Sequence, residues 1–236
     1  MRKAIVVGAS SGIGKEVAIL LAEKGYKVGI TARRKDLLDK LSDANKNFVA
    51  RAFDCTKVNN NEELNALTSA LGGVDLVFIS AGIGHLNRSL DYALEDETNQ
   101  LNVVAFTEIA GWAYNYFKTE GTGQLVAITS LAGLRGGRAA PAYNASKAYQ
   151  ISYLEALRQR ITKDKSNITI TDIRAGFIDT GMAKGKGLFW VAPLPKAAQL
   201  IVKGILSKRT VLYVTKRWRI IAILFKILPR FVYDNM

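Results

Sequence analysis

Two hydrophobic patterns alternate along this chain. Short runs rich in Val, Ile and Phe are apolar at nearly every position, as in strands of a parallel sheet that helices cover on both faces. Between them lie longer segments in which apolar residues recur every three or four positions, the spacing of an amphipathic helix. The short runs predict strands at Lys3–Val7, Lys27–Thr31, Phe48–Ala52, Val74–Ile79, Leu125–Thr129, Ile168–Ile173 and Val211–Val214. The longer segments predict helices at Ile13–Lys24, Asn61–Leu71, Gln100–Lys118, Ala142–Ile161 and Lys196–Leu206.

This order of elements predicts an α/β fold of a single domain. We expect a doubly wound parallel sheet (Rossmann fold) of about seven strands with helices on both faces. Right-handed crossovers bring the carboxyl ends of the strands to one edge, where such folds bind their ligands. No repeat, low-complexity segment or linker divides the 236 residues.

The charge of the chain is unevenly distributed. The formal net charge is +13, and the residues from Lys184 to the end contribute eleven Lys or Arg against one acid, Asp234. The basic character therefore belongs mostly to the C-terminal fifth, where it is mixed with large apolar residues. Because the bases alternate with aliphatic side chains rather than with stacking aromatic ones, we expect no nucleic-acid partner.

The segment 216–231 is basic and very apolar, yet too short to span a bilayer. Three interpretations stay open: packing on a subunit or over a pocket, contact with a membrane surface, or simple core packing. Cys55 is the only cysteine, which suits a reducing compartment, and the apolar run Ala4–Val7 is too short for a signal peptide. We expect a cytoplasmic protein, which the membrane interpretation would place at the inner face of the membrane.

A glycine-rich turn follows the first predicted strand. Glycines at 8, 12 and 14 allow a tight turn and a close approach of the backbone to a pyrophosphate, which the N-terminus of the next helix attracts. The spacing G-x-x-x-G-x-G differs from both G-x-G-x-x-G and the P-loop. The strand–turn–helix context predicts a dinucleotide site formed by Gly8, Ser10, Ser11, Gly12, Ile13 and Gly14.

The end of the second predicted strand bears on the choice of dinucleotide. An NAD site usually has an acid about 20 residues beyond the glycines, but Ala32, Arg33 and Arg34 stand there. A guanidinium matches a phosphate in geometry and charge. We therefore expect NADPH/NADP+ rather than NADH, with Arg33 as the first candidate for the 2′-phosphate, assisted by Ser10 or Ser11. A solvated helix start is the alternative for the two arginines.

Three further residues supply proton-transfer chemistry. Ser130 ends a predicted strand, Tyr143 begins a helix 13 residues later, and Lys147 lies one turn beyond Tyr143 on the same helical face. A tyrosine with a pKa of about 10 is a poor base at neutral pH, but a nearby ammonium stabilises its phenolate. The serine hydroxyl can hold a carbonyl or alcohol oxygen. No pattern of metal ligands is present, and we expect no metal.

With these motifs the chain resembles the short-chain dehydrogenase/reductase family from about Arg2 to Leu206. The resemblance implies a catalytic tetrad of Asn102, Ser130, Tyr143 and Lys147, in which a helix kink at Asn102 holds a water of a proton relay and Lys147 also binds the nicotinamide ribose. It implies that Asp54 and the backbone of Cys55 contact the adenine, and that Ile178 and Thr180 bind the carboxamide. Cofactor contacts are also implied at Tyr143, Ala81, Gly82 and Gly176.

Two positions depart from the family pattern: Ser80 stands for an asparagine, and Ala175 for a proline. We expect slight effects on stability and none on activity. The helices Gln100–Lys118 and Ala142–Ile161 are implied to build a homodimer or homotetramer. The segment Gly181–Pro195 is expected to cover the substrate pocket, either as a lid or as a fixed aromatic anchor. We interpret His85 as a loop residue without chemistry, with a role at the mouth of the substrate pocket as the alternative.

Together these features predict an NADPH-dependent oxidoreductase that reduces a small-molecule ketone or aldehyde to an alcohol, or catalyses the reverse reaction. Lipid-like substrates are included in this prediction. The alternative is a non-catalytic NADPH-sensing protein attached to a membrane or partner by its basic tail. Residues 1–210 are expected to form the dinucleotide-binding and catalytic domain. Residues 211–236 are expected to add a C-terminal strand and a basic apolar extension to that domain.

Overall fold

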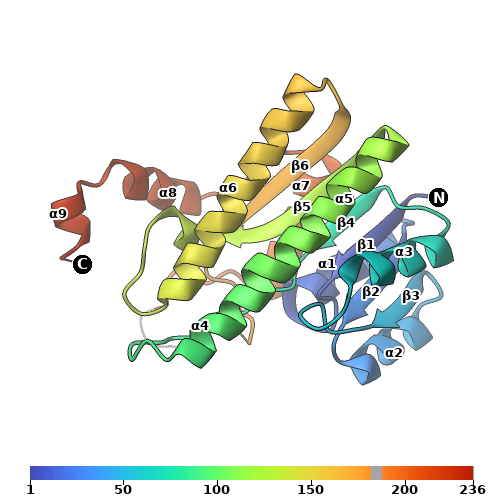
Figure 1. Cartoon of the computed structure of the whole chain (residues 1–236), viewed down its shortest axis with the longest axis horizontal. Coiled ribbons are helices and arrows are strands. Elements are labelled where there is room, and N and C mark those ends of the chain that lie inside the picture. Colours follow the sequence, from blue (N-terminus) through green and yellow to red (C-terminus); the bar gives the residue numbers. More distant parts are fainter. Residues whose placement is uncertain (182–187, 236) are drawn as a thin grey trace.

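The computed structural model describes residues 1–181 and 188–235, and its centre is a seven-stranded sheet (Figure 1). The strand order is β3-β2-β1-β4-β5-β6-β7, and every paired strand is parallel. The strands are β1 (Lys3–Val7), β2 (Lys27–Ala32), β3 (Phe48–Ala52), β4 (Leu76–Ile79), β5 (Thr122–Ser130), β6 (Asn167–Ala175) and β7 (Val211–Val214). The predicted doubly wound parallel sheet is confirmed.

The helices lie on both faces of this sheet. They are α1 (Gly12–Glu23), α2 (Lys35–Ala44), α3 (Asn60–Leu71), α4 (Tyr92–Asn99), α5 (Phe106–Glu120), α6 (Pro141–Lys163), α7 (Leu194–Leu206), α8 (Trp218–Ile227) and α9 (Arg230–Tyr233). A π-helical turn, η1 (Gln100–Ala105), joins α4 to α5, and a 3-10 turn, η2 (Leu131–Leu134), follows β5.

Two apolar clusters form the core, one on each face of the sheet. Side chains of α1, α2 and α7 pack in one cluster, and those of α3, α5 and α6 pack in the other. The strand β1 serves both, because Ala4 and Val6 face the first cluster while Ile5 and Val7 face the second. This two-sided burial is the reason that the strands are apolar at nearly every position.

The topology determines where a ligand crevice lies. The chain leaves β1 toward β2 and β3, then crosses back to place β4 on the other side of β1. The connections that follow β1 and β4 therefore diverge at the carboxyl ends of these neighbours, which opens a crevice there. The glycine turn follows β1, the 80–84 segment follows β4, and Ser130 ends β5, so all three lie along the same edge.

The C-terminal segment joins the sheet and then leaves it. The strand β7 pairs with β6, after which Trp218 and Ala222 of α8 pack on η2. Helices α8 and α9 then extend beyond the rest of the molecule, at the left of Figure 1. Within residues 1–181 and 188–235, no helix combines the length and the apolar character needed to cross a bilayer.

Candidate active site

The glycine turn between β1 and α1 is closely packed against the 80–84 segment. Gly8 has a φ of 90°, and a Cβ there would lie 2.6 Å from the backbone nitrogen of Ala81. A Cβ on Gly14 would overlap the carbonyl oxygen of Gly8. Gly12 has a φ of 57°, in the left-handed region that favours glycine. Side chains at Gly8 and Gly14 would force the turn open, so these two glycines permit the close packing of the turn against the 80–84 segment and against α1.

The N-terminus of α1 is suited to an anion. Ser11 is its N-cap residue, and no side chain of the described residues caps the helix there, so the first-turn N–H groups of residues 12–14 face outward with their partial positive charge. The Arg34 guanidinium donates hydrogen bonds to Ser10 Oγ (2.8 Å) and Ser11 Oγ (2.7 Å). These contacts place a guanidinium and two hydroxyls beside the glycine turn.

Arg33 acts on a different group, the Asp54 carboxyl. Hydrogen bonds from Thr56, assisted by the charges of Arg33 and Lys57, hold the pKa of this carboxyl below its ordinary value, although burial works in the opposite direction. Burial raises the pKa of the neighbouring Cys55 thiol to about 11. The two arginines therefore act on different groups. Arg34 donates hydrogen bonds to the serines of the turn, and the charge of Arg33 acts on Asp54.

Asn102 lies in the π-helical turn η1 and is fully buried. Its side-chain oxygen accepts from the backbone N–H of Ile83 (3.0 Å), and its amide donates to the Ile83 carbonyl (2.7 Å) and to Ser146 Oγ (3.0 Å). The Asn102 side chain thus fixes the segment after β4 against α6. The turn η1 provides the helix kink that the sequence resemblance implies at this residue.

Tyr143 and Ser130 meet at the carboxyl end of β5. Ser130 Oγ accepts from the backbone N–H of Ala132 at 3.1 Å. Burial raises the pKa of the Tyr143 phenol, and a hydrogen bond with Ser130 opposes part of this rise. A Cβ on Gly84 would lie 2.5 Å from the Tyr143 ring, so glycine at this position lets the ring reach its place.

Lys147 is almost completely buried beside Tyr143. Its ammonium lies 5.9 Å from the centre of the Tyr143 ring and donates to the Ile128 carbonyl (3.0 Å) and to Gln150 Oε1 (2.9 Å). Burial lowers its pKa to about 8, and Asp172 acts in the opposite direction. An ammonium that is easily deprotonated, next to a phenol, is a combination suited to proton transfer.

Gln150 was not among the residues that the sequence indicated. It is 1% exposed, and its amide also donates to the Asn102 carbonyl at 2.8 Å. The signal was present, because Gln150 falls on the buried stripe of α6 with Lys147 and Leu154, at helical spacing. A polar residue on an apolar stripe indicates a buried partner.

The far rim of the site follows β6. A Cβ on Gly176 would overlap the Trp218 indole, so this glycine makes room for the first residue of α8. Ile178 is buried and pairs with Ala192 in an isolated parallel bridge. The Thr180 methyl lies 3.8 Å from a Cβ built on Gly12, which brings this residue to the glycine turn.

The expected pocket-covering segment, Gly181–Pro195, is described only in part, since residues 182–187 lie outside the described residues. Phe189 and Trp190 pack their rings with Trp218, and Arg217 donates to the Trp190 carbonyl at 2.9 Å. On the opposite side, His85 Nε2 lies 3.0 Å from Glu97 Oε2. Phe189 and Trp190 contact Trp218 while remaining 48% and 40% exposed, and the choice between lid and fixed anchor stays a prediction.

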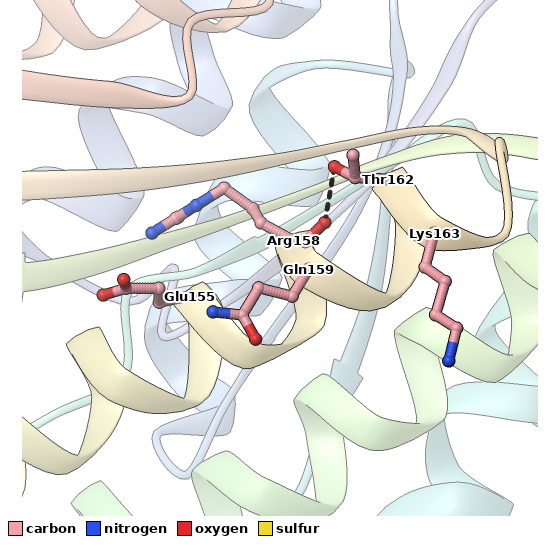
Figure 2. A pocket seen from close by; sticks show the side chains of 5 residues that line it. All are labelled: Glu155, Arg158, Gln159, Thr162 and Lys163. Atoms are coloured by element: carbon pink, nitrogen blue, oxygen red, sulfur yellow. Dashed lines mark hydrogen bonds between the residues drawn. The ribbon is translucent and has the colours of Figure 1, made fainter.

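A shallow hollow on α6 lies apart from these residues (Figure 2). Five side chains of the C-terminal half of the helix line it: Glu155, Arg158, Gln159, Thr162 and Lys163. Arg158 lies eleven residues beyond Lys147, roughly 16 Å along a helix axis.

The described residues contain no group of three or more His, Cys, Asp or Glu side chains that could hold a metal ion. The chemistry-bearing groups therefore gather at the carboxyl edge of the sheet.

Comparison with known proteins agrees with this geometry. Residues 2–188 match the family model described as short chain dehydrogenase. The chain belongs to the short-chain dehydrogenase family. It is therefore an oxidoreductase of the NAD(P)-dependent dehydrogenase/reductase type, as the sequence predicted.

The relatives of this short-chain dehydrogenase include proteins named only by reaction class. An uncharacterized oxidoreductase of Listeria monocytogenes is 34% identical over 184 residues, which are 75% of this chain and 74% of the relative. One from Myxococcus xanthus is 30% identical over 217 residues, 86% of this chain and 83% of the relative. A crystal structure of an actinorhodin polyketide ketoreductase variant with NADPH has the same fold, with a TM-score of 0.79 at 22% identity, covering 90% of this chain and 95% of that one.

Proposed function

We propose that this short-chain dehydrogenase is an NADPH-dependent carbonyl reductase, with Tyr143 as the proton donor. The observation that carries the proposal is the pair of Tyr143 and the buried Lys147, with the ammonium 5.9 Å from the centre of the phenol ring, at the edge of the sheet that also holds Ser130 and the glycine turn. The chemistry that NADPH would supply when bound is hydride donation to a carbonyl carbon.

Each residue has a task in this reaction. Ser130 Oγ orients the substrate oxygen by a hydrogen bond. Tyr143 gives its phenolic proton to that oxygen as negative charge develops there. The Lys147 ammonium favours the phenolate that remains and holds a ribose hydroxyl of the cofactor. Asn102 keeps the 82–84 segment and α6 in register, so that the reacting groups stay aligned. In the reverse direction, the Tyr143 phenolate accepts the proton of an alcohol.

The residues around the glycine turn fit a dinucleotide. Gly8 and Gly14 let the turn pack tightly, and a Cβ on Gly12 would make an ordinary contact at 3.8 Å, so that the uncapped N-terminus of α1 would bind the pyrophosphate together with Ile13. Arg34 with Ser10 and Ser11 would hold the 2′-phosphate, and this arrangement supports NADPH over NADH. Asp54, Cys55, Ala81, Gly82, Gly176, Ile178 and Thr180 complete the proposed contacts. The structural neighbour with NADPH supports the same choice for this chain.

The experiment is an activity panel of ketones, aldehydes and alcohols, including long-chain ones, followed at the NADPH absorbance band. Tyr143→Phe should lower turnover by about 10³-fold while NADPH affinity, measured by calorimetry, stays close to that of the wild type. A variant that retains most of its activity removes Tyr143 as the proton donor. NADPH binding without turnover on any member of the panel favours the non-catalytic sensing protein instead.

The cofactor choice has its own matched pair. Arg34→Ala should weaken NADPH binding by 10- to 100-fold or about 1.4–2.8 kcal/mol, and leave NADH binding almost unchanged. Arg33→Ala is the comparison, because that guanidinium is the neighbouring one and acts on Asp54. Equal weakening of NADPH and NADH by Arg34→Ala speaks against its contact with the 2′-phosphate.

We also propose that the enzyme assembles as a homodimer or homotetramer through α5 and α6. Support comes from aromatic side chains on these helices: Tyr149 is 37% exposed, stacks on Tyr153 and shares a hydrogen bond with Thr107 of α5 (2.7 Å). Light scattering after size-exclusion chromatography measures the assembly, and a monomer at micromolar concentration contradicts it.

A finer proposal concerns the α8–α9 extension, residues 216–235, which we place on the inner face of a membrane. Four residues of α8 turn an apolar stripe away from the protein: Ile220, Ile223, Leu224 and Ile227. Five Lys or Arg against the single acid Asp234 surround this stripe. A second copy would bring like charges together, whereas anionic lipid complements both the charge and the apolar stripe.

Flotation with vesicles of phosphatidylcholine, with and without phosphatidylserine, tests this contact. The wild type should float with the phosphatidylserine vesicles, and Arg219→Gln with Lys226→Gln should reduce the floating fraction. Lys24→Gln with Lys40→Gln removes the same charge from exposed sites on α1 and α2 and is the control. Equal loss in both double variants, or no flotation of the wild type, overturns the contact.

A further inference from the structure

Gln150 occupies a position that joins two members of the proposed catalytic group. Its amide nitrogen donates to the main-chain oxygen of Asn102 at 2.8 Å, and its amide oxygen accepts from the Lys147 ammonium at 2.9 Å. With 1% of its surface exposed, the side chain is sealed from solvent. A buried amide is costly to desolvate unless both of its ends are hydrogen-bonded, and here both are.

The chemistry of the partners dictates the orientation of this amide. An ammonium only donates and a carbonyl only accepts, so the amide oxygen must face Lys147 and the amide nitrogen must face Asn102. An ammonium has three N–H donors. Two of those on Lys147 go to the Ile128 carbonyl and to Gln150, which leaves the third for a ligand in the crevice.

We propose that Gln150 is a positioning residue that connects Asn102 to Lys147. The inference rests on the proposed reductase function, and it assigns a role to a residue outside the tetrad. A side-chain amide holds its two partners at a fixed separation. The Lys147 ammonium is therefore oriented by a side chain of its own helix, which also holds the main chain of Asn102.

Few other charges compete with Gln150 for Lys147. From its own helix, Tyr143 lies one turn away, and from β6 the Asp172 carboxylate favours the charged amine. The sequences of β5, η1 and η2 contain no ionisable side chain. On α4, Glu95 accepts from Asn87 and Glu97 pairs with His85. Loss of the Gln150 contact should therefore reach Lys147 without compensation from these elements.

Three variants on α6 test this role. Gln150→Leu removes both contacts, and Gln150→Glu keeps an acceptor for Lys147 but adds a charge and loses the donor for Asn102. Gln159→Leu makes the same change at an exposed site of the same helix and is the matched control. Thermal unfolding identifies the variants that fold, and Gln150→Glu serves if Gln150→Leu does not.

The expected result is a split between turnover and substrate binding. Gln150→Leu should lower kcat by about 10- to 100-fold, as misaligned catalytic groups do, with KM for the carbonyl almost unchanged. The alkaline limb of its kcat–pH profile should move to lower pH, because a buried ammonium without its acceptor loses its proton more easily. In Gln150→Glu that limb should move to higher pH. Gln159→Leu should match the wild type in every measurement.

Two results overturn the proposal: a folded Gln150→Leu with wild-type kcat, or a loss of kcat with an unmoved alkaline limb in both Gln150 variants. The reductase assignment fails separately, by the absence of turnover in the wild type. In that event calorimetric NADPH affinity across pH still tests Gln150. The affinity for NADPH should begin to fall at a lower pH in Gln150→Leu than in the wild type. Coincident curves of affinity against pH would reject the positioning role of Gln150.

Discussion

The polar centre around Lys147 and the α8–α9 extension differ in how completely the folded chain provides partners for their side chains. Around Lys147, a buried amine, two amides and a backbone carbonyl each meet partners within the chain. On α8, the outward stripe leaves Ile220 65% and Ile227 71% exposed, while Trp218 and Ala222 on the opposite side of the helix are buried. One region is complete in the isolated chain, and the other has apolar area that only a partner can cover.

This difference separates two kinds of function. The groups around Lys147 are held in place before any ligand arrives, which is what a catalytic site requires. The exposed stripe contributes little to folding, since its side chains are as accessible in the folded chain as many are in the unfolded one. Substitutions should therefore affect both stability and turnover at the centre, and affect association alone on the extension.

The largest expected effect concerns the cost of burying the Lys147 charge. Its pKa lies at about 8 instead of 10.5, which corresponds to about 3 kcal/mol. Between these two pH values the unfolded chain binds the proton that the folded chain has released, so this contribution to stability rises with pH. Chemical denaturation of the wild type and Lys147→Met at pH 7 and pH 11 should show that the wild type gains about 3 kcal/mol of stability relative to the variant as the pH rises. A difference in stability that stays constant with pH would mean that the pKa of Lys147 is not lowered in the folded chain.

A methyl group on Gly84 should disturb the centre by a slightly smaller amount. Because its Cβ would lie 2.5 Å from the Tyr143 ring, Gly84→Ala should displace the phenol and lower kcat by about 100-fold, or about 2.7 kcal/mol. Gly136→Ala is the control, since nothing lies within 4 Å of a Cβ there. Equal kcat in the two variants would show that the ring position is not critical.

Gly176→Ala tests the joint between the two regions. The added Cβ would overlap the Trp218 indole, so the variant should lose about 1–3 kcal/mol, as overpacked cores do. Its tryptophan emission should also shift to longer wavelength as the indole becomes more exposed. A stability and emission equal to those of the wild type would contradict the close packing of Trp218 against Gly176.

The smallest expected effect lies on the outward stripe of α8. Ile227→Asn should change the free energy of unfolding by at most about 0.5 kcal/mol, while lowering flotation with phosphatidylserine vesicles. Ala222→Asn, at a fully buried position of the same helix, should cost several times more in stability because it places an amide in the core. A large stability loss in Ile227→Asn would show that the stripe is covered in the free protein.

Much of the fold followed from hydrophobic periodicity, because all seven strands are nearly continuous apolar runs. The strands β1, β3 and β7 have the predicted bounds. The strand β5 is longer by three residues at its start and one at its end, β6 is longer by one and two, and β4 begins two residues later than predicted. The helices α2 and α4 were missed, although in α2 the residues Leu37, Leu38 and Leu41 recur at helical spacing and Leu38 is fully buried. The predicted helix Gln100–Lys118 begins as η1, because side-chain periodicity does not distinguish a π turn from an α turn.

The parts of the candidate site that depend on residue type and spacing were predictable from the sequence. The glycines and the Tyr143–Lys147 spacing could be recognised from the sequence, because a tight turn and a shared helical face follow from spacing alone. Which of Arg33 and Arg34 contacts the serines of the glycine turn depends on the path of the backbone after β2. The sequence alone does not specify that path. The partners of Gln150 come from η1 and from its own helix, a pairing that only the tertiary arrangement specifies.

Cys55 gives the protein a practical property. It is the sole thiol of the chain, and with a pKa of about 11 only about one molecule in 10⁴ carries the reactive thiolate at neutral pH. Maleimide reagents should therefore leave the native chain almost unlabelled. A cysteine introduced at a chosen surface position would take up a fluorophore or spin probe alone, so immersion depth could be mapped site by site without first deleting a native residue.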